Sequence, residues 1–170
     1  MDVGDLRSLY LHELQELCDC EAQVVKALPT LALSAGSAAL RSAMRKHAEQ
    51  TARHEQLVEV ILRRHGSSPT PDIDQVATAL VKKTEQVMFE VADSDLRDAA
   101  LIAMIRRIEH HQFSAYSTAE GYAKALYLEI DRHSLLIILE EERIIDRRLA
   151  SLQVEVNDLA IMVSTQLYGQ

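Results

Sequence analysis

Apolar residues recur at intervals of three and four positions in four long segments of the chain, which is the spacing of one face of an α-helix. The segments span residues 2–33, 37–65, 94–124 and 128–154. Each apolar stripe is continuous enough to be buried against neighbouring helices. The pattern therefore predicts four long helices around one core.

The breaks between these segments predict how the helices connect. Short links at residues 35–36 and 126–127 make the first two helices one antiparallel hairpin and the last two another. The stretch over residues 66–93 is long enough to cross the length of a bundle, and within it a helical pattern over 73–91 has Asp72 as its N-cap. Pro29 lies inside the first segment, where we expect it to kink the last turns.

We therefore predict an all-α fold: a ferritin-like four-helix bundle with one long crossover that contains a short helix, plus a short C-terminal helix over residues 156–166. Residues 1–170 form a single domain, made of a helical hairpin (2–65), the crossover (66–93), a second hairpin (94–154) and a C-terminal segment (155–170). The 5 glycines and 3 prolines are too few for the many turns of a β-sandwich or barrel.

Charge and composition narrow the range of partners. The chain has 26 acidic and 18 basic residues, a net charge of −8, so nucleic acid and anionic membrane surfaces are poor partners. No apolar run approaches the roughly 20 residues of a membrane span, and the acidic N-terminus lacks an export signal. We expect a cytoplasmic protein. Its cysteines, Cys18 and Cys20, point to different helix faces and are expected to be free thiols.

A polar residue interrupts each of the four apolar stripes in mid-helix. A buried carboxylate without a partner is costly, so each of these residues must be neutralised, paired or bound to a cation. The four residues are Glu21, His54, Glu109 and Glu142.

Their positions along the chain place these four residues at one level. Glu21 and His54 have their midpoint at 37.5, beside the first link, and Glu109 and Glu142 have theirs at 125.5, beside the second. At about 1.5 Å per residue, each lies roughly 25 Å from its link. Both pairs are separated by 33 residues, so the two hairpins are similar and the four side chains are predicted to converge in the core.

Converging carboxylates and an imidazole are the donors that divalent iron, manganese or zinc prefer. Asp146, one turn after Glu142, is a further inward candidate. The ferritin-like di-metal site has a Glu-x-x-His on each of two helices, and this chain lacks that motif at both places. One ion or two therefore stays open, as does a core held by ion pairs alone. The predicted metal ligands are Glu21, His54, Glu109, Glu142 and Asp146.

The nearby histidines are interpreted as structural. His47 lies one heptad from His54, about 10 Å along the helix axis, and is predicted to be a core or dimer-interface residue outside the metal site. His110 and His111 point roughly 100° apart on their helix, so at most one of them can approach Glu109. We expect either to act by contacting a ligand and not as a ligand itself.

Short motifs that continue to about Leu152 share a pattern with a known family. They include Leu9-Tyr10-Leu11-His12-Glu13-Leu14, Cys20-Glu21-Ala22-Gln23, His47-Ala48-Glu49-Gln50, Ile108-Glu109-His110, Ala115-Tyr116 and Leu139-Glu140-Glu141-Glu142. Together they resemble the YciE/YciF-like family of ferritin-like proteins. The resemblance implies a bacterial, stress-associated homodimer with a metal site at the centre of the bundle.

The chain departs from the pattern of that family at several positions. Gln50 and Gln112 stand where the family often has Glu, His111 stands where it has Tyr, and Cys20 and Cys18 lie where it has Ala and Tyr. Two fewer carboxylates leave less negative charge to balance a second cation. The departures therefore favour a single metal ion over two.

Two functions remain as hypotheses. The first is a metal-binding protein that oxidises or sequesters Fe(II), or removes peroxide, with iron preferred over manganese or zinc and dioxygen or peroxide as partners. The second is a non-catalytic helical dimer with a structural or protein-interaction role in the stress response. Acyl and phosphoryl transfer are not supported, because the chain has neither a glycine-rich phosphate loop nor a nucleophile elbow.

Overall fold

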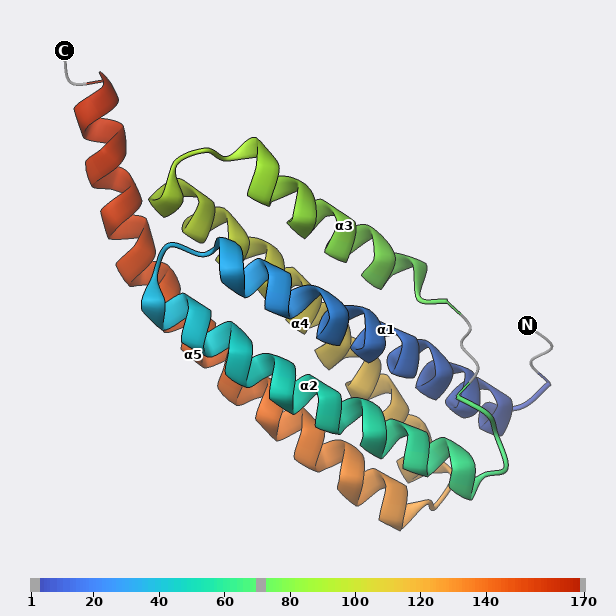
Figure 1. The fold of residues 1–170 in the computed structure, drawn as a ribbon. Helices are drawn as coiled ribbons and strands as arrows, with labels where there is room; N and C mark the ends of the chain where they lie inside the picture. Colours follow the sequence, from blue (N-terminus) through green and yellow to red (C-terminus); the bar gives the residue numbers. More distant parts are fainter. Residues whose placement is uncertain (1–3, 70–72, 169–170) are drawn as a thin grey trace.

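The computed structural model describes residues 4–69 and 73–168, with backbone alone over 163–168. The described residues form five helices and no strand: α1 (Leu6–Ser34), α2 (Ala38–Arg64), α3 (Gln75–Glu90), α4 (Ser94–Ala125) and α5 (Glu129–Tyr168). The four long helices α1, α2, α4 and α5 make the bundle, and α3 lies along α1 and α4 (Figure 1). The predicted bundle of two hairpins joined by one long crossover is confirmed.

The C-terminal region differs from the prediction. Instead of a separate short helix over 156–166, α5 continues without a break for 40 residues, and its end extends beyond the other helices (Figure 1). No glycine or proline lies between Glu129 and Tyr168 to end the helix. Although α5 is long, neither it nor any other helix in the described part of the chain has an apolar stretch that would cross a membrane.

Side-chain caps fix where the helices begin. Asp5 accepts a hydrogen bond from the backbone N–H of Ser8 at the start of α1, and Ser37 accepts one from Leu40 at the start of α2. The N-cap of α3 is Asp74; the predicted cap, Asp72, lies outside the described residues. Pro29 lies within α1 without ending it.

The link between α1 and α2 is tied to α4 by one buried carboxylate. Asp98 of α4 accepts hydrogen bonds from the backbone N–H groups of Gly36 (2.9 Å) and Ser37 (2.6 Å). Gly36 suits this close approach, because a Cβ at this position would lie 3.0 Å from the Cβ of Ser94. The first hairpin is therefore locked to the start of the second.

Replacing Asp98 with asparagine is expected to lower the free energy of unfolding by about 1.5–3 kcal/mol, because the neutral amide has a single acceptor oxygen and loses one of two hydrogen bonds to a charged group. Urea denaturation followed by circular dichroism measures the change. The exposed Asp158 of α5 provides the matched control, and Asp158→Asn should leave the stability unchanged. Equal stabilities for the two variants would contradict this role for Asp98.

The apolar core consists of two clusters, one towards each end of the bundle. One lies at the α1–α2 link and includes Leu28, Met44 and Ile105; the other lies at the α4–α5 link and includes Tyr10, Ile61 and Leu135. Between them, every long helix contributes buried polar residues. We call this set the central polar layer; it comprises Glu21, His47, Thr51, His54, Glu109, Gln112 and Glu142.

Candidate metal centre

The structure brings the four predicted mid-helix residues into the bundle interior, one from each long helix. Glu21 on α1, His54 on α2, Glu109 on α4 and Glu142 on α5 are each at most 2% exposed. One ligand atom from each of Glu21, His54 and Glu142 lies within 4.8 Å of the other two. Three of the four predicted side chains therefore meet within ligand distance of one another, and Glu109 lies outside that group of three.

Hydrogen bonds from outside this group orient two of its members. The Tyr116 hydroxyl donates to Oε1 of Glu21 at 2.6 Å. His54 lies between two carboxylates, with Nε2 2.7 Å from Oε2 of Glu141 and Nδ1 3.0 Å from Oε1 of Glu142. Burial raises the pKa of Tyr116 well above its usual value, so its phenol keeps the proton that it donates.

His47 is buried in the core, as predicted, and it also contacts Glu109, one of the predicted ligands. Its side chain is 3% exposed, and its Nε2 lies 2.5 Å from Oε1 of Glu109. The separation of about 10 Å from His54 is a distance along the axis of α2 alone. It ignores the reach of the Glu109 side chain, which crosses from α4 towards the N-terminal part of α2.

The structure places Asp146 at the edge of the site, where it is already partnered. Its carboxylate lies 2.8 Å from Nε of Arg106 and 3.2 Å from Nε2 of His110, and its side chain is 29% exposed. It is not among the residues whose ligand atoms meet at Glu21, His54 and Glu142. A ligand role for Asp146 remains a prediction that would require the Arg106 contact to be given up.

Burial dominates the electrostatics of the carboxylates. It raises the pKa of Glu21 to about 7, with the Glu142 charge adding to the effect, and it likewise raises the pKa of Glu109 and of Glu142 to about 7. Burial lowers the pKa of His47. At His54, burial opposes protonation, but contact with Glu142 and the charge of Glu21 raise the pKa to about 9.

Most atoms of the central polar layer lack a hydrogen-bond partner within the described part of the chain. Of the twelve buried side-chain nitrogen and oxygen atoms without one, eleven belong to the seven residues of this layer. They include both oxygens of Glu109, both of Glu142, and both polar atoms of the Gln112 amide. Native proteins seldom leave buried polar atoms unsatisfied, so this concentration points to a missing binding partner.

In the rest of the described structure, the buried carboxylates have partners. Asp98 accepts two backbone hydrogen bonds, and Asp131 contacts the side chains of Tyr10, Arg64 and His65. Among the buried carboxylates of the described residues, those without partners are therefore confined to the central polar layer. Once deprotonated, the three carboxylates and two imidazoles of this layer are donors that fit a divalent transition metal ion, which would satisfy several of these atoms at once.

A surface pocket between α4 and α5 gives access to this layer. Glu109 and Glu142 line its inner end, and Phe113, Arg143 and Asp146 are among its other lining residues. A second pocket, between α2, α4 and α5, is lined by His47 and Gln50. The first pocket therefore brings the surface close to the two carboxylates, which themselves remain buried.

Comparison with known proteins supports the fold over nearly the whole chain. A family described as a domain of unknown function (DUF892) matches residues 5–160. Protein YciF of Escherichia coli K12 is 25% identical over 155 residues, which cover 91% of this chain and 93% of YciF.

Two solved structures are similar to this one. The crystal structure of the E. coli stress protein YciF has a TM-score of 0.88 at 23% identity, covering 92% of this chain and 99% of that one. YcfI from Rhodopseudomonas palustris, described as a candidate structural protein, has a TM-score of 0.84 at 26% identity, covering 88% and 95% of the two chains. The bundle is therefore shared with both.

Proposed function

Because the chain belongs to the DUF892 family, whose description assigns no activity, we propose a function from the site itself: the central polar layer binds a divalent transition metal ion. The observation that carries the proposal is the set of eleven unsatisfied buried atoms in this layer. Since similar proteins include one described as a stress protein, we further propose a role in protection against stress.

Glu21, His54 and Glu142 would hold the ion, because their ligand atoms already lie within reach of one another. Glu109 and His47 would supply the remaining donors from α4 and α2. Three carboxylates and two imidazoles suit iron and manganese and are compatible with zinc. Among these ions, iron is the one that we propose. Gln112 supplies an uncharged amide at the same level, which favours one ion over two.

Iron bound here would supply electron-transfer chemistry towards dioxygen or peroxide. The residues of the chain position the donors: Tyr116 holds Glu21, and Glu141 holds His54 by its second nitrogen. The two apolar clusters on either side keep bulk water from the layer. Small reactants would approach from the pocket that Glu109 and Glu142 line, which is the side of the layer nearest to the surface.

Metal titration of the Glu142→Gln variant tests the proposal. Calorimetry with Fe(II) under anaerobic conditions should show affinity reduced by at least about tenfold, because one ligand loses its charge. Glu140→Gln is the matched control, since Glu140 lies two residues away with a side chain that is 55% exposed. Unchanged Fe(II) affinity in Glu142→Gln would refute the central site. Oxygen uptake after Fe(II) addition then tests oxidation separately from binding.

The alternative function is a non-catalytic homodimer with a structural role. It is favoured by the apolar side chains exposed on α5, since Ile144, Val154, Leu159, Ile161 and Met162 are each at least 49% exposed. A second copy of the chain would cover them. Sedimentation would show a dimer, and melting temperatures unaffected by a chelator would favour this function over metal binding.

A further inference from the structure

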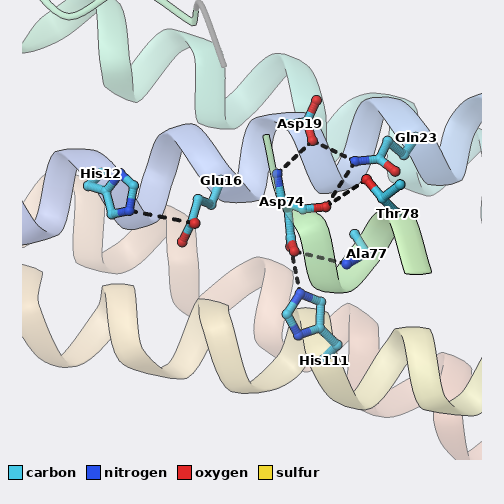
Figure 2. A network of polar contacts seen from close by, with 8 residues as sticks. All are labelled: His12, Glu16, Asp19, Gln23, Asp74, Ala77, Thr78 and His111. Carbon is cyan, nitrogen blue, oxygen red and sulfur yellow. Dashed lines mark hydrogen bonds and ion pairs between the residues drawn. The ribbon is translucent and has the colours of Figure 1, made fainter. Parts of the chain in front are cut away.

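A second group of metal-binding side chains lies outside the central polar layer, where α1, α4 and the start of α3 meet. Cys20 of α1, Asp74 at the N-cap of α3 and His111 of α4 each offer a ligand atom within 4.8 Å of the other two. Figure 2 shows Asp74 and His111 pointing towards each other from α3 and α4. None of the three belongs to the central polar layer.

Asp74 is held in place by several hydrogen bonds. Its Oδ1 accepts from the backbone N–H of Ala77 at 2.9 Å, and its own N–H donates to Oδ2 of Asp19 at 2.9 Å (Figure 2). The same Asp19 oxygen accepts from the Gln23 amide, which also donates to the carbonyl of Asp74. The remaining oxygen, Oδ2, is therefore fixed in direction, and it lies 2.6 Å from Nε2 of His111.

Cys20 of α1 contributes the third donor atom of this group. Its side chain is fully buried and is not in a disulfide. A thiolate, an imidazole and a carboxylate from three separate helices form a donor set typical of zinc, with the thiolate selecting against the harder cations. The central polar layer, in contrast, has no sulfur donor.

The group is open to solvent on one side. A surface pocket is lined by Asp74 and His111 together with Glu13 and Glu16 of α1. His111 is half-buried, with 25% of its side chain exposed. A cation can therefore enter from the pocket, and a water molecule or a glutamate from α1 can fill the fourth position of a tetrahedral site.

We propose that Cys20, Asp74 and His111 form a second metal site, selective for zinc-like cations. On binding, the S–H bond of Cys20 breaks and the proton between Nε2 of His111 and Oδ2 of Asp74 is displaced; both protons leave to the buffer, and bonds from sulfur, nitrogen and oxygen to the metal form. The cation would replace the direct contact between Asp74 and His111 and would join α3 to α1 and α4. The site shares no ligand with the central polar layer, so either can exist without the other.

Cobalt titration of the purified full-length protein tests this site, because Co²⁺ bound to a thiolate gives a charge-transfer absorption in the near ultraviolet that oxygen and nitrogen ligands do not give. The band is expected to saturate at one Co²⁺ per chain and to disappear when excess Zn²⁺ is added. Cys20→Ser should abolish the band. His111→Gln should reduce the Co²⁺ affinity by at least about tenfold.

Matched variants separate this site from its neighbours. Cys18→Ser alters the other buried cysteine of α1 and should retain the band, and Glu142→Gln should retain it because it affects only the central layer. Circular dichroism establishes that each variant is folded. Two results would overturn the proposal. One is that folded wild-type protein gives no band with excess Co²⁺, in which case the contact between Asp74 and His111 only anchors α3. The other is that the band persists in Cys20→Ser.

Discussion

Replacing Glu109 with leucine is expected to make the metal-free protein more stable, by about 1–3 kcal/mol, while removing its response to metal. Glu109 is buried and, apart from the contact of its Oε1 with His47, neither of its oxygens has a hydrogen-bond partner, so the wild-type protein bears the cost of keeping this carboxyl group from water. Leucine has a similar volume and suits the adjoining apolar clusters. Its neighbour His47 loses little, because burial lowers the pKa of that imidazole and keeps it neutral.

Thermal unfolding with and without Mn²⁺ measures both parts of this expectation. For a chain of this size the gain corresponds to roughly 2–4 °C in melting temperature for each kcal/mol. Glu140→Leu is the control: Glu140 is exposed, and its replacement should change neither the metal-free melting temperature nor the rise caused by Mn²⁺. A Glu109→Leu variant that is less stable than metal-free wild type would show that this carboxyl group serves the fold.

The metal-free protein is expected to lose stability as the pH rises from about 5 to about 8. The pKa values of Glu21, Glu109 and Glu142 are raised by burial from 4.5 to about 7, so the folded chain holds protons that the unfolded chain releases. The contribution of these groups is complete below pH 4.5 and is lost as the pH rises through about 7. His54, with its pKa raised from 6.5 to about 9, continues the decline at higher pH. A shift of this size at one carboxyl group corresponds to a loss on the order of 3 kcal/mol.

Metal binding should show the opposite dependence on pH. An ion needs the carboxylates and imidazoles deprotonated, so the rise in melting temperature caused by saturating Mn²⁺ should increase between pH 5 and pH 8. Melting curves at four pH values, with and without the ion, measure both trends. The Glu142→Gln variant should show a shallower metal-free decline and little response to Mn²⁺. Metal-free wild type whose melting temperature rises over this pH range would contradict the assignment.

The fold and the position of the site along the bundle axis could be predicted, because both depend on how many residues separate the helices' polar positions from the links. Equal distances from a tight link place Glu21 beside His54, and Glu109 beside Glu142, whenever the two helices of a hairpin are straight and of regular rise. The interruption of each apolar stripe then identifies which polar residues face inward. Neither inference needs the packing of individual side chains.

The sequence could not predict which polar side chains meet across helices. His47 and Glu109 are 62 positions apart, and their contact depends on the relative rotation of α2 and α4, which no local pattern encodes. Asp146 was predicted from its place one turn after Glu142, but Arg106 of α4 reaches the same carboxylate. The group of Cys20, Asp74 and His111 was likewise hidden, because the path of the crossover sets the position of Asp74.

The location of the central polar layer, halfway between two apolar clusters, affects how the protein unfolds. A layer of unsatisfied groups weakens the packing that makes the two ends of the bundle behave as a single cooperative unit. An ion held by α1, α2, α4 and α5 together would couple those ends, so that neither could open without losing the ion. Metal supply would then govern the resistance of the entire domain to local opening and proteolysis.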